Sequence, residues 1–184
     1  MNKSIWMLLL LLCAPPVPAA EPVAGADQIL GLWVTDKGAA HVEIYREQDL
    51  YHGRLVWLAE PLYPADDPEA GESKHDRNNP DPARRKAPLL GLQIMQGFRA
   101  VAEGRWQGGT IYDPETGETY SCKLWLTDDG TLKVRGYVGI SLFGRTTEWM
   151  PLVGANMQPA ESAPAAQRQD SAPVQQSEKE QGKP

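Results

Sequence analysis

The stretch "GGTIYDPETGETYSC", from Gly108 to Cys122, decides the fold class. It lies across two strand-like segments, "RWQGGTIYD" and "ETYSCKLWL", which the short connection "PETG" joins. A proline fixes φ early in a turn, and Gly117 can take the positive φ that a bulged turn needs. The stretch therefore predicts a β-hairpin that turns after Asp113, with Glu115 and Glu118 at or next to its exposed tip.

The hairpin also contains a glycine pair and a cysteine. Gly109, which follows Gly108, predicts a bulge or a close approach of another chain segment. Cys122 alternates with apolar residues, so it should point inward and behave as a small, inert hydrophobic side chain. A catalytic thiol would need a nearby histidine, which the sequence alone does not exclude. The residues expected to share the inward face of Cys122 are Tyr120, Leu124 and Leu126.

The same short, alternating pattern runs through most of the chain and predicts at least seven strands at spacings of about ten residues. One segment, from Leu89 to Glu103, fits either a strand or a short helix. Regular antiparallel strands with tight turns predict an all-β fold, either a barrel or a sandwich. We expect an up-and-down β-barrel of about eight strands, because closure removes exposed edges. The clearest strand segments are 41–46, 50–58, 105–113, 118–126, 131–139 and 142–150.

A long insertion interrupts this pattern between Ala59 and Pro88 and contains six prolines. A loop of this length inside a compact domain is usually functional or partly disordered. Its acidic part could offer oxygen ligands to calcium, but it lacks the glycine-centred ligand spacing of a calcium loop. We therefore interpret it as a solvated acidic stretch, consisting of Asp66, Asp67, Glu69 and Glu72.

No other metal or cofactor site is expected. The three histidines, His41, His52 and His75, do not follow a zinc-ligand spacing. No Gly-x-Ser-x-Gly or Ser-x-x-Lys motif is present.

The end of the insertion, "NNPDPARRKAPLLG", has two interpretations. It could be a lid that contacts an anion through Arg84 and Arg85, or a rigid connector whose asparagines bond to the backbone. The connector is favoured. The tryptophans also have two interpretations, since they could line a ligand cavity or fill the core, and the core is favoured. They are Trp33, Trp57, Trp106, Trp125 and Trp149.

Both ends of the chain look different from this domain. Residues 1–19 read as a signal peptide, with a basic start, an apolar run of ten residues and a predicted cut after Ala19 or, alternatively, Ala20. A lipid anchor on Cys13 is disfavoured because Leu12 stands where its processing site needs a small residue. We expect a linker over 20–27, the barrel over 28–153, and a disordered tail over 154–184 that is rich in Ala, Pro, Gln, Ser and Glu.

These features predict an exported protein, in the periplasm of a Gram-negative cell. No later segment has the roughly eighteen apolar residues needed to cross a membrane. Removal of Lys3 with the leader leaves 17 basic residues against 24 acidic ones, a formal charge of −7. Such a charge argues against non-specific nucleic-acid binding. Cys122 would be the one remaining cysteine, so no internal disulfide is expected.

Several motifs together resemble the bacterial exported family called domain of unknown function 2147 (DUF2147), over roughly residues 28–152. They are Gly31-Leu32-Trp33, Asn79-Pro80-Asp81-Pro82 with Arg84, Gly91, "WQGGTIYDPETGETY", "LKVRGYVG" and "GRTTEW". The resemblance gives as signature positions Gly31, Trp33, Pro80, Gly108, Gly109, Asp113, Gly117, Gly136, Arg145 and Trp149.

Members of this family are similar to lipocalin-like (calycin) barrels. Gly31-x-Trp33 resembles the start of a lipocalin, and the resemblance implies that Arg145 packs on Trp33. The insertion at 59–88 and the missing disulfide depart from that pattern. A barrel of this size can also be filled by its own side chains.

We therefore expect a non-enzymatic binder of a small apolar or amphipathic ligand, without a cofactor and without catalytic residues. The alternative is a structural or interaction protein of the cell envelope with a filled barrel, and an enzyme ranks third. No protein partner is predicted. The candidate ligand-binding residues are Trp57, Trp106, Tyr112, Tyr120, Asn79 and Arg84.

Overall fold

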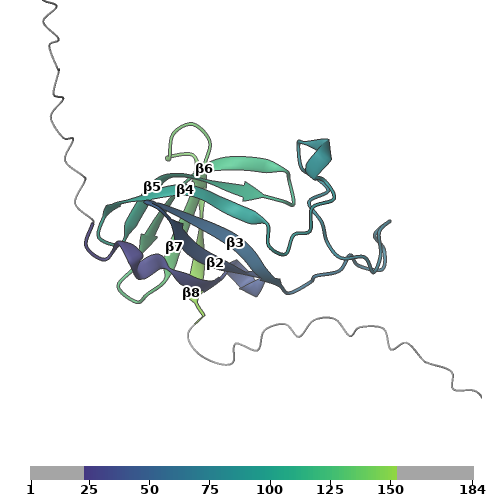
Figure 1. Ribbon diagram of the computed structural model, residues 1–184, viewed down its shortest axis with the longest axis horizontal. Coiled ribbons are helices and arrows are strands. Elements are labelled where there is room, and N and C mark those ends of the chain that lie inside the picture. The colour runs from purple at the N-terminus through teal and green to yellow at the C-terminus, as the bar shows by residue number, and fades with distance from the viewer. Residues whose placement is uncertain (1–22, 153–184) are drawn as a thin grey trace, which may run out of the picture. The chain divides into compact units, whose positions relative to one another are not determined.

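A computed structural model describes residues 23–152 as a closed barrel of eight antiparallel strands (Figure 1). Each strand pairs with the next one in sequence, and the last pairs with the first, which confirms the predicted up-and-down barrel. The strands are β1 (Gly31–Val34), β2 (Ala40–Glu47), β3 (Leu50–Leu58), β4 (Gln93–Ala102), β5 (Arg105–Asp113), β6 (Glu118–Leu126), β7 (Leu132–Tyr137) and β8 (Gly144–Pro151).

Three short 3-10 helices accompany the strands: η1 (Ala26–Ile29), η2 (Asp36–Gly38) and η3 (Pro82–Arg84). The segment that fitted either a strand or a helix forms strand β4. The last two residues of the expected linker over 20–27 belong to η1, and its residues 20–22 lie outside the described residues. Among the described residues, no helix is long and apolar enough to span a bilayer. The predicted signal peptide and the predicted tail lie outside the described residues.

The barrel closes through a short seam between β1 and β8. Only two pairs of residues face each other there, Trp33 with Pro151 and Val34 with Met150. After Val34 the chain leaves the sheet and enters η2. The first part of β8 therefore pairs with β7 alone, and η2 lies beside it. This arrangement leaves the barrel wall less complete at the end where β8 begins.

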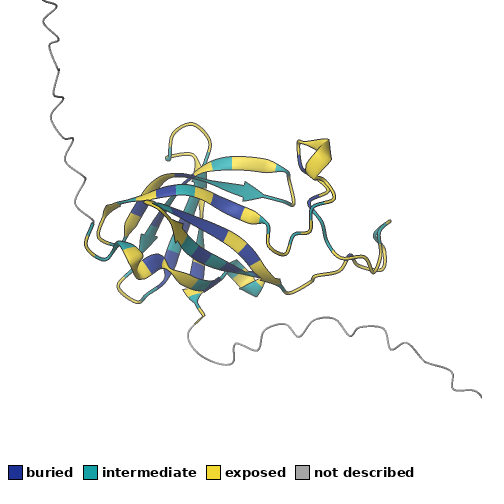
Figure 2. Ribbon diagram, in the orientation of Figure 1, coloured by how far each residue is buried: buried dark blue, intermediate teal, exposed yellow. Residues whose placement is uncertain are grey.

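The opposite end of the barrel is plugged by η1. The indole N–H of Trp33 donates to the carbonyl oxygen of Ile29 at 2.8 Å, and that of Trp106 donates to the carbonyl of Ala26 at 3.1 Å. The hydroxyl of Tyr51 donates to the carboxylate of Asp27 at 2.7 Å. Large buried aromatic side chains thus satisfy their polar atoms on the plug. We call this end the closed end, and its tightly buried members include Ile29, Phe98, Trp106, Leu124, Leu132 and Trp149 (Figure 2).

The glycine pair of β5 shows why the core packs closely at this level. A Cβ atom on Gly109 would overlap the ring of Phe98, so no larger residue fits there. The register between β5 and β6 shifts between Trp106 and Gly109. The predicted bulge and close approach are both confirmed. Cys122 lies opposite Gly109 and is fully buried beside Leu124, as its alternation predicted.

The expected packing of Arg145 on Trp33 is wrong. Arg145 stands near the start of β8, whereas Pro151, at the end of that strand, is the residue that pairs with Trp33. The two side chains therefore lie toward opposite ends of the barrel. The cation–π contacts among the described residues involve other arginines, such as Arg77 over Tyr63.

Candidate functional site

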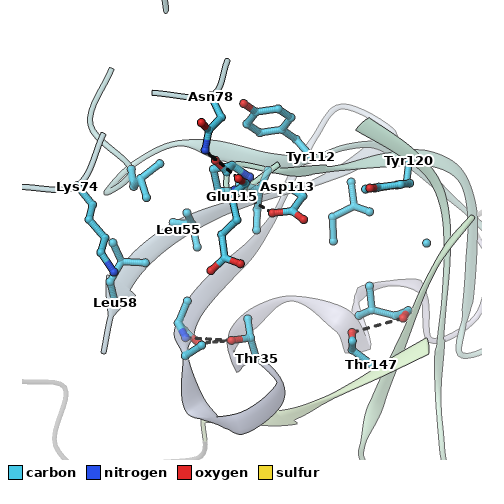
Figure 3. A pocket seen from close by; sticks show the side chains of 18 of the residues that line it. Thr35, Leu55, Leu58, Lys74, Asn78, Tyr112, Asp113, Glu115, Tyr120 and Thr147 are labelled. Atoms are coloured by element: carbon cyan, nitrogen blue, oxygen red, sulfur yellow. Dashed lines mark hydrogen bonds between the residues drawn. The ribbon is translucent and has the colours of Figure 1, made fainter. Parts of the chain in front are cut away.

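The end opposite the η1 plug holds an open pocket of about 1140 Å³. We call this end the open end (Figure 3). The inner wall of the pocket comes from inward-facing residues of six strands, and most of it is apolar. Gly136 contributes no side chain, which leaves room between Ile111 and Tyr120. The inner-wall residues are Ala40, Leu55, Leu58, Ile94, Ile111, Tyr120, Val134 and Gly136.

The rim of the pocket carries charges of both signs. Lys37 comes from η2, Arg145 from β8, and Glu115 from the tip of the β5–β6 hairpin. Across the part of the chain that the structure describes, the side chains of these three residues make no hydrogen bond and no ion pair within 4.0 Å. The same holds for the hydroxyl of Tyr120 on the inner wall. These groups are therefore available to a ligand.

A buried polar cluster holds the loop between β3 and β4, residues 59–92, against the barrel beside this pocket. Asp76 is fully buried, and its carboxylate accepts from the hydroxyl of Tyr112 at 2.6 Å and from the amide of Asn79 at 2.5 Å. Desolvation, and then the bond to Asp76, raise the pKa of Tyr112 to about 12. Tyr112 therefore remains a neutral phenol near neutral pH, and its hydroxyl donates a hydrogen bond to the carboxylate of Asp76. We call these three residues the loop anchor.

A second contact fixes the same loop to the hairpin tip. The side-chain amide of Asn78 donates to the carbonyl oxygens of Pro114 at 3.2 Å and Glu115 at 2.8 Å (Figure 3). Gly117 has φ of 76°, and a Cβ there would overlap the Asn78 carbonyl oxygen. The glycine is thus required twice, for its backbone conformation and for the approach of the loop. The predicted positive φ is confirmed, and the close approach was not foreseen.

The acidic part of the loop is less solvated than predicted. The guanidinium of Arg77 makes two bonds to the carboxylate of Asp67, at 2.9 and 2.8 Å, and lies 4.2 Å from the ring centre of Tyr63. The bonds from Arg77 are the main reason that the pKa of Asp67 is lowered. Glu69 faces His75 at 3.1 Å. The described residues contain no group of three or more side chains placed to hold a metal ion.

The predicted ligand residues separate into three groups. Tyr112 and Tyr120 line the pocket, although the hydroxyl of Tyr112 is taken up by Asp76. Asn79 belongs to the loop anchor, and Arg84 is exposed with its guanidinium 3.6 Å from Asp81, so neither contacts the pocket. The remaining two are tryptophans.

Trp57 and Trp106 also do not line the pocket. Trp57 lies outside the barrel, where it stacks on His41 with 4.3 Å between the ring centres. Trp106 is fully buried at the closed end. Trp33 and Trp149 are likewise core residues, so the core interpretation is confirmed for three of the five tryptophans. It is wrong for Trp57 and for Trp125, which lies half-buried on the outer face of β6.

Cys122 is not placed for chemistry. Its side chain is fully buried, and burial raises the pKa of its thiol to about 12. Its one hydrogen bond within the described chain runs to the carbonyl of its neighbour Lys123 at 3.8 Å. Such a thiol is neither ionised nor accessible near neutral pH.

Sequence reasoning missed Asp76, whose partner Tyr112 lies more than thirty residues away in β5. Asn78 begins the stretch "NNPDPARRKAPLLG", and its bonds to the carbonyl oxygens of Pro114 and Glu115 agree with the connector interpretation, in which the asparagines bond to the backbone. The sequence did not indicate that these partners lie in the turn after β5. Sequence reasoning also missed the pocket contributions of Leu55 and Val134. The alternation of their strands did mark both of these residues as inward-facing.

Comparisons with known proteins support the family and the fold. The model of one bacterial family, described as "Uncharacterized protein conserved in bacteria (DUF2147)", matches residues 31–150. A solved structure of protein HP1028 from Helicobacter pylori, which its title assigns to the lipocalin family, superimposes with a TM-score of 0.57 at 18% identity. The match covers 71% of this chain and 84% of that chain. No curated protein matches the chain.

Proposed function

The chain belongs to the bacterial DUF2147 family, and from the fold and pocket of this member we propose that it is a non-enzymatic binder of a small amphipathic ligand. The carrying observation is the pocket of about 1140 Å³ at the open end. Ligand sites are typically concave and mostly apolar, with a few polar groups that fix orientation. This pocket has both parts.

The inner wall favours an apolar ligand portion. Leu55 and Val134 are almost completely buried from solvent, yet they border the cavity. Ile94 and Ile111 complete an aliphatic surface against which a hydrocarbon chain would displace water. The closed end is filled by tryptophan and phenylalanine side chains, so a ligand would occupy only the open half of the barrel.

The rim favours a polar ligand headgroup. Among residues 23–152, the side chains of Lys37, Arg145 and Glu115 have no hydrogen-bond or ion-pair partner, and Tyr120 lines the same pocket. A purely apolar molecule would leave these groups unused, whereas an amphipathic molecule would contact them with its polar end. This rim is the reason for preferring an amphipathic ligand over a simple hydrocarbon.

We also propose that the protein acts in the periplasm. The support is the three-part pattern of residues 1–19, with a basic start, a ten-residue apolar run and a small-residue cut site. The alternative function, an interaction protein with a filled barrel, is less consistent with the open half of the barrel.

The proposal can be tested by filling the pocket. A Cβ on Gly136 would make ordinary contacts of 3.6 Å with Ile111 and Tyr120, and its φ is not in the left-handed region. Gly136→Leu should therefore fold and place its side chain in the pocket. Ser121→Leu is the matched control, because Ser121 is exposed on the outer face of β6.

The assay is displacement of a fluorescent fatty-acid analogue by a panel of fatty acids and lysophospholipids. We expect binding by the wild type, the same binding by Ser121→Leu, and a loss of about tenfold or more in Gly136→Leu. Native mass spectrometry of protein purified from its own cells should detect a co-purifying small molecule. A clean apo mass together with no binding by any member of the panel would refute the proposal.

A further inference from the structure

The β7–β8 loop, residues 138–143, exposes four large apolar side chains to solvent. Val138, Ile140, Leu142 and Phe143 are 70%, 62%, 75% and 72% exposed. The loop stands clear of the barrel at the top of Figure 1 and is exposed in Figure 2. Scattered apolar residues on a surface need no explanation, but four within one six-residue loop mark an interaction site.

The loop is held in this conformation rather than left free to collapse onto the barrel. The guanidinium of Arg135 donates to the carbonyl oxygens of Ser141 at 2.8 Å and Leu142 at 3.1 Å. The ammonium of Lys123 donates to the hydroxyl of Ser141 at 3.3 Å. These bonds fix the backbone of the loop, so the apolar side chains are presented outward.

The residues that hold the loop also form a basic hollow on the outer face of the barrel. This hollow, of about 380 Å³, is lined by Arg105, Lys123 and Arg135 together with Trp125, Gln107 and Thr146. Lys123 and Arg135 are direct cross-strand partners, a pairing of like charges that destabilises a sheet. Within residues 23–152, no carboxylate lies within 4.0 Å of these three cations.

This concentration of positive charge is unusual for the chain as a whole. The formal net charge is −6, but residues 131–148 contain three basic residues, Lys133, Arg135 and Arg145, and one acidic residue, Glu148, which pairs with Lys133. The acidic residues of the neighbouring β5–β6 hairpin, Asp113, Glu115 and Glu118, lie at or beside its tip. A hollow lined by three cations beside the exposed apolar side chains of the β7–β8 loop is complementary to an anionic partner that also has an apolar layer.

We propose that the β7–β8 loop and the basic hollow form a docking site for an anionic lipid bilayer. The four apolar side chains enter the interfacial region, and the cations of the hollow contact the phosphate headgroups. Both contributions are known to add in interfacial binding, apolar burial from the loop and attraction of basic residues to anionic lipid. Val138 and Phe143 also border the pocket, so docking would set the pocket mouth against the lipid surface.

The docking site does not depend on the proposed ligand-binding function, and the two can be separated by mutation. Ile140 and Leu142 belong to the loop but do not line the pocket, whereas Gly136 lines the pocket and lies outside the loop. Ile140→Ser/Leu142→Ser should lose membrane binding and keep ligand binding. Gly136→Leu should do the reverse.

The experiment is flotation of the purified protein with phosphatidylcholine vesicles, with or without phosphatidylglycerol. We expect binding to the anionic vesicles and little binding to the neutral ones. Ile140→Ser/Leu142→Ser should weaken binding about a hundredfold, because two large apolar side chains no longer enter the interface. Leu90→Ser/Val101→Ser is the matched control, since both positions are exposed apolar residues away from the loop.

A second pair of variants tests the basic hollow. Arg105→Gln/Lys123→Gln removes two cations of the hollow and should weaken binding to anionic vesicles about thirtyfold. Arg84→Gln/Lys86→Gln changes the net charge by the same amount in the 59–92 loop, at positions that line neither the hollow nor the pocket, and should leave vesicle binding unchanged. Thermal unfolding of each variant verifies that it remains folded.

Three results would overturn the proposal. The first is failure to bind anionic vesicles, or binding that Ile140→Ser/Leu142→Ser does not weaken. The second is calorimetric binding of inorganic phosphate without any vesicle binding, which would make the hollow a site for a free anion. The third is a concentration-dependent dimer that the double serine variant abolishes while vesicles are not bound, which would make the loop an interface between two copies.

Discussion

Replacement of Gly117 by alanine should destabilise the fold more than its backbone conformation alone explains. With φ at 76°, an alanine pays about 1–2 kcal/mol for the left-handed conformation. Its Cβ would also overlap the carbonyl oxygen of Asn78, so the 59–92 loop must move away from the hairpin. This movement breaks the two bonds that Asn78 donates to Pro114 and Glu115, worth about 1 kcal/mol each. The expected total is about 3–4 kcal/mol.

Gly130→Ala separates the two effects. Gly130 has φ of 81°, but nothing lies within 4 Å of its added Cβ, so only the backbone cost of about 1–2 kcal/mol should appear. The free energies of unfolding are measured by urea titration for both variants and for Asn78→Ala. Asn78→Ala should cost less in the Gly117→Ala background than alone, because the bonds are already broken. Equal losses for Gly117→Ala and Gly130→Ala would show that the loop does not pack on the hairpin.

Three further predictions concern buried polar groups and the thiol. Asp76→Ala leaves the hydroxyl of Tyr112 and the amide of Asn79 without an acceptor, so it should cost about 2–4 kcal/mol and make residues 59–92 sensitive to limited proteolysis; a protease-resistant loop would contradict the anchor. The pKa of Tyr112 is raised to about 12 from an ordinary value of 10, so the folded state holds this proton more tightly. Its stabilisation is present below pH 10 and is lost as the pH rises toward 12, and urea midpoints should fall less over that range in Tyr112→Phe than in the wild type. Cys122, whose thiol pKa is also about 12, should resist thiol reagents at neutral pH in the folded protein and react after unfolding; fast reaction under native conditions would show that the site opens.

The barrel itself could be predicted from sequence because each strand pairs with its neighbour along the chain. Local alternation and turn chemistry were then sufficient. They gave the β5–β6 hairpin, the positive φ of Gly117, the close approach at Gly109 and the inward position of Cys122. None of these features depends on a contact between distant parts of the sequence.

The position of Trp57 shows where this reasoning stops. Simple alternation along β3 gives Trp57 the same face as Leu55. The register between β2 and β3 shifts, however, because His41 faces Trp57 while Val42 faces Leu55. One extra residue in β3 therefore turns Trp57 outward, and Leu58 takes the inward position. The alternating pattern itself contains no sign of such a bulge.

The long loop was unpredictable for a different reason. Asp76 and Asn78 act through partners in β5 and its turn, which are distant in sequence and have no complementary pattern around them. A motif such as Asn-Pro-Asp-Pro indicates a fixed backbone but not the surface on which it rests. The predicted contact between Arg145 and Trp33 was wrong for a similar reason. The family resemblance indicated which two residues to expect, but it did not indicate the strand register, which places them toward opposite ends of the barrel.

The distribution of stability and chemistry within the barrel supports the functional proposals. The η1 plug, Trp106 and Phe98 fill the closed end and leave no room for a ligand there. The segments outside the β-sheet that carry polar or exposed groups, namely η2, the 59–92 loop and the β7–β8 loop, all border the pocket at the open end. Substitutions in the closed end should therefore change the free energy of unfolding and leave ligand binding intact. Substitutions of residues that line the pocket at the open end, apart from the loop anchor and the Asn78–Gly117 contact, should change ligand binding at nearly constant stability. A barrel that served only as a rigid structural element would show no such separation.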